Sequence, residues 1–442
     1  MGLFDARVPR YTSYPTSPQF SDAVGPKNTK TWIEAIQPGS KVSLYVHVPF
    51  CRRLCWFCAC RTQGTTKMAP VTAYVETLKA ELSLLQATLP DGVEIEHLHW
   101  GGGTPTLLPP ESITKLTAAI LKAAPLAKDA QFSVEIDPSE IDDERLDALA
   151  AAGMNRASIG VQDFDEEIQK LIGREQSYEV TKAAVDALRA RGITSLNMDI
   201  LFGLPNQSKA GISDSVQKVL SLSPDRVALY GYAHVPWMAR RQTLIPTDAL
   251  PTPPERLDLF ETASELFVWD GYEPIGIDHF ARPEDGLATA QKSGRLRRNF
   301  QGYTEDTSET LIGVGASSIS RYPGGYAQNN PSTSGYQSAV RSGSLATTRG
   351  HAFTADDRMR GRVIEVLMCD FVVDFNALAK EFGVPASTFA DFASGLDKAF
   401  PGMVLLSKDT LKVTKQGHPL ARMIARHFDA YAVSETGHSH AV

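Results

Sequence analysis

Six strand-like segments separated by helical patterns constrain this chain more than any other feature. The strand-like segments are 43–48, 94–100, 132–136, 156–161, 196–201 and 227–232. Helical periodicity is seen between them at 74–89, 113–120, 143–152 and 178–189, and beyond the last at 254–267. Strands that alternate with helices form a parallel sheet with right-handed crossovers. We therefore predict an α/β fold, either an open doubly wound sheet or a full or partial (β/α) barrel.

Four of the five cysteines lie together, directly after the first predicted strand. They are Cys51, Cys55, Cys58 and Cys60, separated by three, two and one residues. Thiolates are soft metal ligands, and a loop this tight can wrap one centre. The spacing therefore predicts a metal site at the end of the first strand.

Three kinds of centre fit clustered cysteines to different degrees. Structural zinc usually takes two separated ligand pairs, and no second pair follows here. A disulfide framework is typical of small secreted proteins, whereas this chain has 442 residues. An iron–sulfur cluster held by Cys51, Cys55 and Cys58 would leave one iron without a protein ligand. The spacing favours this third alternative, with zinc and disulfides less favoured.

The length and the 43% apolar content allow one barrel-sized domain and a smaller one. We predict an N-terminal arm over 1–40, a barrel with an extension over 41–350, and a smaller, mostly helical domain over 351–442. Prolines and hydroxyl residues in 9–16 favour an extended arm. Thr354 and Asp357 predict a capping box that begins the last domain. We expect the tail at 434–442 to be unstructured.

Charge and hydropathy exclude several classes of protein. No apolar run approaches the length of about 18 residues that a membrane span needs, and we expect no signal peptide. The formal net charge of −7 argues against a general nucleic-acid binder. We therefore expect a soluble, cytoplasmic protein that binds neither membrane nor nucleic acid, with a monomer as the default.

Polar or glycine-rich residues follow the other predicted strands. In a barrel, the carboxyl ends of the strands share one functional edge. The residues at these ends are the glycines and threonines of 101–106, Glu135, Gln162, Asp199 and Ala233. Burying Glu135 in an apolar strand is costly without a partner, so either a ligand or a buried salt bridge would explain it. These positions together predict one shared site.

A basic and aromatic segment lies at 295–303. Arg295, Arg297 and Arg298 precede Phe300 and Tyr303. Such a cluster is usually a solvated face, although arginines beside aromatic rings also bind carboxylates.

The cysteine pattern at the end of the first strand resembles that of the radical S-adenosylmethionine (SAM) superfamily. Within it, the chain closely resembles the oxygen-independent coproporphyrinogen III oxidases from Pro9 to about His427. The specific marks are PRYTSYPT at 9–16, Cys60, GGGTPT at 101–106 and RNFQGY at 298–303. The resemblance implies a partial (β/α)6 barrel with a mostly helical C-terminal domain.

The resemblance also implies the cofactors. Cys51, Cys55 and Cys58 would bind a [4Fe-4S] cluster, and Cys60 would not be a ligand. Two SAM molecules are expected. The one on the cluster would contact Tyr45, Gly102, Glu135 and Ile319, of which Tyr45 and Glu135 are expected to be catalytic. The second would be lined by Phe57, Gly103, Thr104, Gln162, Arg174, Asp199 and Ala233.

The implied reaction converts two propionates of coproporphyrinogen III to vinyl groups, giving protoporphyrinogen IX, through a 5′-deoxyadenosyl radical and with an unidentified reductant and electron acceptor. We add the hypothesis that Arg295, Arg297 and Arg298 include at least one contact to the propionates. The alternatives are a haem-binding chaperone-like relative and a radical SAM methyltransferase that modifies haem. The arm at 9–16 argues against both, and Cys60 argues against the chaperone.

Overall fold

The computed structural model describes residues 8–431. The tail predicted to be unstructured lies outside the described residues, as do residues 1–7. No helix within 8–431 is long and apolar enough to cross a membrane.

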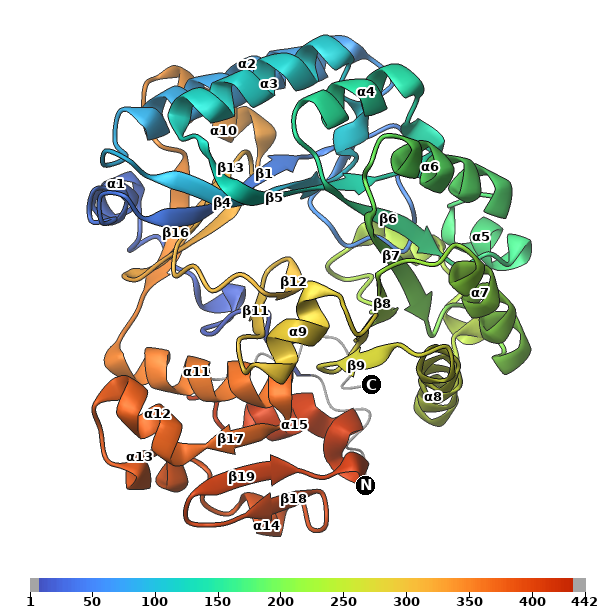
Figure 1. Cartoon of the computed structure of the whole chain (residues 1–442), viewed down its shortest axis with the longest axis vertical. Coiled ribbons are helices and arrows are strands. Elements are labelled where there is room, and N and C mark those ends of the chain that lie inside the picture. Colours follow the sequence, from blue (N-terminus) through green and yellow to red (C-terminus); the bar gives the residue numbers. More distant parts are fainter. Residues whose placement is uncertain (1–7, 432–442) are drawn as a thin grey trace.

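Six parallel strands form the centre of the molecule, each beside the next (Figure 1). They are β1 (Lys41–Val48), β4 (Glu94–Gly102), β5 (Leu126–Ile136), β6 (Arg156–Gln162), β7 (Ser195–Phe202) and β8 (Arg226–Gly231). The strand order follows the chain order, which is the arrangement that right-handed crossovers produce. All six predicted strands are confirmed to within two residues at each end, except that β5 begins six residues earlier than predicted.

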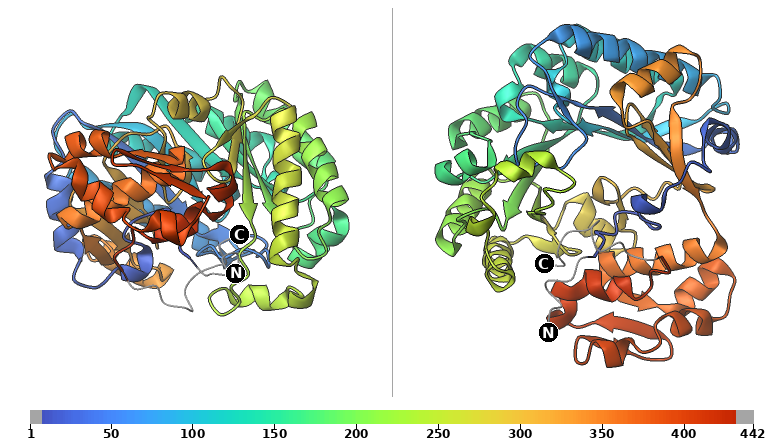
Figure 2. Two further views of the ribbon diagram at one scale, coloured as in Figure 1. Left: turned by 90° about the horizontal axis from the view of Figure 1, so that it is seen from below. Right: turned by 180° about the vertical axis from the view of Figure 1, so that it is seen from behind.

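Helices cover the outer face of this curved sheet (Figure 1). They are α2 (Met68–Gln86), α3 (Pro110–Ala123), α4 (Asp143–Ala151), α5 (Glu166–Ile172), α6 (Tyr178–Ala190), α7 (Lys209–Ser221) and α8 (Pro253–Trp269). Their apolar faces are buried against the strands; Leu78 of α2 and Ile113 of α3, for example, are fully buried. The rear view in Figure 2 shows the same layering.

The barrel is partial, because other strands flank β1 and β8. Beside β1 lies the parallel strand β13 (Leu311–Val314), and β8 is followed by β10 (His279–Ala281) in antiparallel orientation. Three more antiparallel strands extend the β13 edge and one extends the other. They are β14 (Ile319–Tyr322), β15 (Gly325–Asn329), β16 (Thr347–Ala352) and β9 (Glu273–Ile275). An extension of the barrel up to residue 350 was predicted, but its strands were not, since 273–350 shows little periodicity.

The six parallel strands present their two faces differently. In β5, Phe132, Val134 and Ile136 are buried toward the helices, while Ser133 and Glu135 are half-buried on the inner face. β6 and the first six residues of β7 alternate in the same way, whereas most of β1 is buried on both faces. The inner face of β5, β6 and β7 therefore carries half-buried polar side chains. This open inner face leaves room for ligands.

The N-terminal region contains a helix where an arm was predicted. Helix α1 spans Pro26–Glu34, with Pro26 in its first turn and the Asn28 side chain accepting from the Gly25 N–H. Proline suits a first helical turn because its missing N–H would have no partner there. Between residue 8 and α1 the chain forms a short 3-10 turn at Ser17–Gln19 and an isolated antiparallel bridge between Ser21 and Gly350.

The C-terminal region forms its own apolar core (Figures 1 and 2). Its helices are α11 (Ala355–Asp370), α12 (Phe375–Phe382), α13 (Ala386–Phe392), α14 (Leu396–Ala399) and α15 (Ala421–Arg426), beside a sheet of β17 (Val372–Asp374), β19 (Thr410–Val413) and β18 (Val404–Leu406). The capping box of Thr354 and Asp357 is confirmed. Tyr11 and Tyr14 of the N-terminal region are buried in this core.

A small bridging region joins the barrel to the C-terminal region (Figure 1). It consists of α9 (Gly286–Lys292) and the hairpin of β11 (Arg297–Asn299) and β12 (Gly302–Thr304). The Tyr303 hydroxyl donates to the Met368 carbonyl of α11 at 2.7 Å and accepts from the Ile277 N–H at 3.0 Å. One tyrosine thus ties the hairpin to both neighbours.

Candidate functional site

The cysteine loop leaves the carboxyl end of β1 and is held at several points. The short strands β2 (Phe50–Cys51) and β3 (Gln63–Gly64) pair at its base. The Trp56 N–H donates to the Ile172 carbonyl at 2.8 Å. The Gln242 side chain donates to the carbonyls of Phe57 at 2.7 Å and Ala233 at 3.0 Å. The loop is therefore fixed against the end of α5 and, through Gln242, against the loop after β8.

The thiols of this loop suit an iron–sulfur cluster. Cys51, Cys55 and Cys58 are half-buried and free of disulfides, whereas Cys60 is exposed. Arg174 approaches the Cys55 sulfur at 3.6 Å, and the Cys60 backbone N–H donates to the Cys58 sulfur at 3.4 Å. Hydrogen bonds from Cys60 lower the pKa of Cys58 and so favour its thiolate.

No three His, Cys, Asp or Glu side chains within 8–431 are arranged to hold a single metal ion. Three thiols spread over one loop instead fit a cluster, in which each thiolate binds a different iron atom. The donor set therefore accommodates the cluster that the sequence predicts.

The glycine turn at the end of β4 brings backbone close to the cysteine loop. Gly102 has φ of +109°, and a Cβ there would lie 2.4 Å from the His47 ring. A Cβ on Gly103 would lie 2.5 Å from the Phe50 carbonyl oxygen. Thr104 is buried, and its N–H donates to that same carbonyl at 2.8 Å. Only glycine fits at both positions of this turn.

Tyr45 and Glu135 lie in one polar group on the inner face. The Tyr45 hydroxyl is 3.0 Å from His47 Nδ1, and its ring stacks on His99 with centroids 5.8 Å apart. Glu135 accepts from the Gly102 N–H at 2.9 Å and lies 3.4 Å from His99 Nε2. Burial would raise the pKa of Glu135, but hydrogen bonding to His99 and Gly102 outweighs it and lowers that pKa.

One premise about Glu135 was wrong. Its side chain is 42% exposed, so it is not sealed in an apolar strand. The alternation of β5 puts Glu135 on the open inner face while its two neighbours point toward the helices. The carboxylate is therefore available to a ligand as well as to His99.

Four of the residues expected around a second SAM, namely Gln162, Arg174, Asp199 and Ala233, come from β6, from β7 and from the loops after α5 and β8. Gln162 ends β6 with φ of +72°. Arg174 is 9% exposed and donates to the Gly160 carbonyl at 2.9 Å, while its Nε has no hydrogen-bond partner within 8–431. Asp199 accepts from Asn197 at 2.8 Å and Ser158 at 3.2 Å. Burial raises the pKa of Asp199 to about 6.

Ile319 comes from outside the six-strand core. It begins β14, and its carbonyl oxygen would be 2.8 Å from a Cβ on Gly313 of β13. Gly313 is the register partner of Tyr45. The structure therefore brings Ile319 to the strand next to Tyr45.

The three arginines at 295–298 do not converge. Arg295 is exposed and donates to Ser293, and Arg297 donates to the Leu296 carbonyl. Arg298 has a side chain only 5% exposed, with its guanidinium 4.5 Å from the centre of the Tyr303 ring. Neighbouring strand residues point to opposite faces, so Arg298 alone of the three lines the cavity described next.

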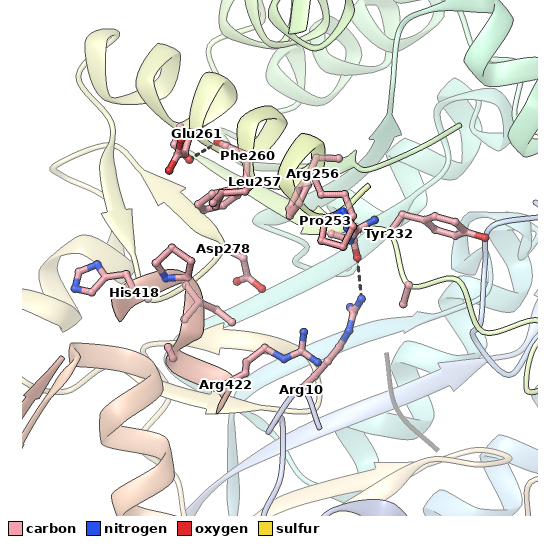
Figure 3. A pocket seen from close by; sticks show the side chains of 18 of the residues that line it. Arg10, Tyr232, Pro253, Arg256, Leu257, Phe260, Glu261, Asp278, His418 and Arg422 are labelled. Atoms are coloured by element: carbon pink, nitrogen blue, oxygen red, sulfur yellow. Dashed lines mark hydrogen bonds between the residues drawn. The ribbon is translucent and has the colours of Figure 1, made fainter. Parts of the chain in front are cut away.

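A cavity of about 690 Å³ lies between the barrel and the C-terminal region (Figure 3). It adjoins the 231–234 loop that carries Ala233, and apolar side chains such as Phe260 and Ile277 form much of its wall. Its cationic residues are Arg10, Arg256, Arg298, Lys415 and Arg422, and its anionic residues are Asp278 and Glu261. The volume and the mixture of apolar walls with a few charges are typical of a ligand site.

Sequence reasoning missed Arg10, Arg256 and Arg422. Burial, with repulsion from Arg10 and Arg298, lowers the pKa of Arg422 to about 9. Burial, with repulsion from Arg10, lowers the pKa of Arg256 to about 10. The motif at 9–16 includes Arg10 and was the one signal that pointed to it. Gln242 donates hydrogen bonds to the Phe57 and Ala233 carbonyls, but no motif in the sequence indicated this role.

Residues 45–219 match the family model of the radical SAM superfamily. The chain is 61% identical to an oxygen-independent coproporphyrinogen III oxidase from Paracoccus denitrificans, over all of this chain and 98% of that protein. It is 39% identical to the protein of that name from Escherichia coli, over 96% of this chain and 93% of the other.

A solved structure agrees with the sequence relatives. Coproporphyrinogen III oxidase from Escherichia coli, described as a radical SAM enzyme, superimposes with a TM-score of 0.91 at 37% identity. The superposition covers 96% of this chain and 98% of that one. The likeness thus includes the barrel, the bridging region and the C-terminal region.

Proposed function

The chain belongs to the oxygen-independent coproporphyrinogen III oxidases of the radical SAM superfamily, and from this premise we propose how its own residues serve the reaction. That reaction is the oxidative decarboxylation of two propionates of coproporphyrinogen III to vinyl groups, giving protoporphyrinogen IX in haem biosynthesis. Three half-buried thiols lie at the carboxyl end of β1, and the loop at the carboxyl end of β8 borders the arginine-lined cavity. Both lie at the same edge of the sheet, and this is the observation on which the assignment rests.

Cys51, Cys55 and Cys58 would hold the [4Fe-4S] cluster, leaving Cys60 unligated. When bound, cluster and SAM supply a 5′-deoxyadenosyl radical that removes a hydrogen atom from a propionate side chain. Tyr45, Gly102, Glu135 and Ile319 would contact the SAM at the cluster. The hydrogen bonds of Glu135 to Gly102 and His99 hold its carboxylate ready for this contact.

A second SAM would bind between the cysteine loop, the turn after β4 and the carboxyl-terminal parts of β6, β7 and β8. The residues proposed to line it are Phe57, Gly103, Thr104, Gln162, Arg174, Asp199 and Ala233. The Nε of the buried Arg174 has no hydrogen-bond partner within 8–431, which supports a ligand here because a buried N–H donor is costly to leave unbonded. Gln242 acts on this site as a positioning residue through the Phe57 and Ala233 carbonyls.

The substrate would occupy the cavity, with Arg298 as a contact to a propionate. Its Nε and Nη1 are buried without a hydrogen-bond partner within 8–431. Arginine binds carboxylates through paired N–H donors, and coproporphyrinogen III carries four carboxylates. Arg295 and Arg297 do not line the cavity and are not proposed as contacts.

We further propose a cytoplasmic monomer that takes electrons from a separate reductant and passes the last substrate electron to a separate acceptor. Analytical ultracentrifugation of the anaerobically purified protein tests the monomer. A sedimentation coefficient for a 48.1 kDa particle is expected.

The function is tested by anaerobic incubation of the iron–sulfur-reconstituted protein with coproporphyrinogen III, SAM and a reductant. Protoporphyrinogen, measured as fluorescent protoporphyrin after oxidation, is expected from the wild type and not from Cys55→Ala. Tight haem binding without product would instead identify a haem chaperone. Iron and sulfide analysis of the same preparation distinguishes a cluster from zinc.

A further inference from the structure

Two carboxylates within 8–431 line the cavity, Asp278 and Glu261, and Asp278 is the one that lies beside the arginines. In Figure 3 its side chain points into the cavity and faces Arg422, with Arg10 beyond. The Asp278 Oδ1 lies 3.9 Å from Arg298 Nη1 and accepts from His279 Nδ1 at 2.7 Å. Burial would raise the pKa of Asp278, but Arg298 and His279 outweigh it and keep that pKa low, so the group is anionic.

The backbone around Asp278 is rigidly held. Its carbonyl accepts from the Leu229 N–H of β8 at 2.8 Å. The preceding residue, Ile277, donates to the Tyr303 hydroxyl at 3.0 Å. Gly276 has φ of +53°, and a Cβ there would lie 2.1 Å from the Tyr303 ring. This turn is preorganised to aim one carboxylate into the cavity.

A counter-ion for the arginines is the simplest role for Asp278, but it conflicts with the proposed substrate. A tetracarboxylate should meet cations, and an acid between them would repel it. A porphyrinogen, however, has a second polar region: four pyrrole N–H donors around the macrocycle centre, inside the ring of carboxylates. A carboxylate flanked by arginines complements that pattern, since it accepts several hydrogen bonds at once.

We propose that Asp278 binds the centre of the tetrapyrrole by accepting hydrogen bonds from its pyrrole N–H groups, while Arg10, Arg298 and Arg422 bind its peripheral carboxylates. This rests on the proposed function and adds a basis for selectivity. Coproporphyrin III, the fully oxidised macrocycle, keeps all four carboxylates but has only two central N–H groups on a flat ring. Asp278 therefore distinguishes the reduced substrate from its oxidation product.

The test compares binding of the two macrocycles to Asp278→Asn by anaerobic equilibrium dialysis, with bound ligand measured as porphyrin fluorescence after oxidation. A hydrogen-bonded charge implies a loss of about tenfold or more in affinity for coproporphyrinogen III. Coproporphyrin III binding should change by less than about threefold, because its N–H contacts are fewer. The matched control is Glu273→Gln on the same hairpin, whose carboxylate pairs with Lys292 at 2.7 Å and does not line the cavity.

Equal effects on both macrocycles, or unchanged affinity for coproporphyrinogen III, would overturn the proposal. If Asp278→Asn does not fold, the affinity of the wild-type protein for N-methylcoproporphyrinogen III, which lacks one pyrrole N–H, is measured instead. Binding as tight as that of the parent compound would refute the N–H contact. Failure of the wild type to make protoporphyrinogen would instead refute the proposed function, so the two failures are distinct.

Discussion

We expect single charged side chains to determine what the cavity between the barrel and the C-terminal region binds. Arg298 is enclosed and lacks hydrogen-bond partners at two nitrogens within 8–431, although it stacks on Tyr303. Arg295, three residues earlier, is exposed. Their contrast gives a matched pair of variants with the same change in charge.

Arg298→Gln should raise the KM for coproporphyrinogen III by about 10- to 100-fold, because a charge-assisted hydrogen bond to a carboxylate is lost. The KM for SAM should stay the same, since Arg298 is not among the residues proposed to contact it. Arg295→Gln should leave both constants within about twofold. Steady-state kinetics with each substrate varied in turn provide the measurement. Equal behaviour of the two variants would contradict a substrate contact at Arg298.

The raised pKa of Asp199 leads us to predict that the free energy of unfolding depends on pH. Burial, only partly offset by the hydrogen bond from Asn197, raises its pKa from 3.8 to about 6. The folded chain then binds more protons than the unfolded chain between about pH 4 and 6, so stability falls as the pH rises through this window. The loss is complete above about pH 7 and amounts to at most about 3 kcal/mol, at 1.36 kcal/mol per pKa unit.

Asp199→Asn should therefore be more stable than the wild type at pH 7.5 and equally stable near pH 4. Urea unfolding of the ligand-free protein at both pH values measures the difference. Asp186→Asn, on the exposed side of α6, is the control and should show no such gap. If the wild type is as stable as Asp199→Asn at pH 7.5, the ionised Asp199 carboxylate does not destabilise the folded protein.

At the scale of elements, the helices and strands that could be predicted from the sequence are those with a regular periodicity or a local hydrogen-bond motif. The six strands and the capping box of α11 were found because burial repeats regularly or because a local hydrogen-bond motif is encoded. Helix α5 has seven residues, too few for a repeat, and begins and ends through the Asp165 cap and Gly173. Strands β13 to β16 have four to six residues each, too few for a clear repeat. β13 pairs with the distant β1, whereas β14, β15 and β16 each pair with the preceding strand.

The turn after β4 depends on glycine for two reasons that can be separated. Gly102→Ala would bring both backbone strain, since φ is +109°, and a clash with the His47 ring. Gly153, after α4, has φ of +94° but nothing within 4 Å of a Cβ. Gly153→Ala should therefore cost about 1 kcal/mol of stability and leave the site unchanged.

Gly102→Ala should lose as much stability or more and should also weaken SAM binding at least tenfold, because the turn carries the proposed cofactor contacts. Anaerobic equilibrium dialysis with labelled SAM, together with urea unfolding of both variants, makes the comparison. Intact SAM affinity in Gly102→Ala would remove this turn from the cofactor site.

Over the whole molecule, the site is assembled from segments that are far apart in the chain. Residues at strand ends were predictable, because parallel strands bring their carboxyl ends to one edge. Arg10 and Arg422 come from opposite ends of the chain and meet only through tertiary packing. The Arg422 guanidinium donates to the carbonyls of Pro9 at 3.2 Å and Val8 at 2.6 Å. No local pattern could have paired them.

The segment before α1 links the C-terminal region to the cavity through Tyr14. Its ring is 6% exposed within the C-terminal core, and its hydroxyl accepts from the Ala430 N–H at 3.0 Å. Removing a buried aromatic ring costs about 3–5 kcal/mol. Tyr14→Ala should therefore destabilise the C-terminal region selectively, whereas Tyr14→Phe should cost only about 1 kcal/mol for the hydrogen bond.

Tyr14→Ala should also displace Arg10 in the proposed substrate site. Tyr14 anchors the segment in which Arg10 donates to the Gly231 carbonyl at 2.8 Å. Tyr14→Ala should raise the KM for coproporphyrinogen III while the protein still holds its cluster, whose cysteines lie in the barrel. Limited proteolysis should cleave first within 355–431, and iron content should match that of the wild type. A loss of cluster together with the C-terminal region would show instead that the two regions unfold as one unit.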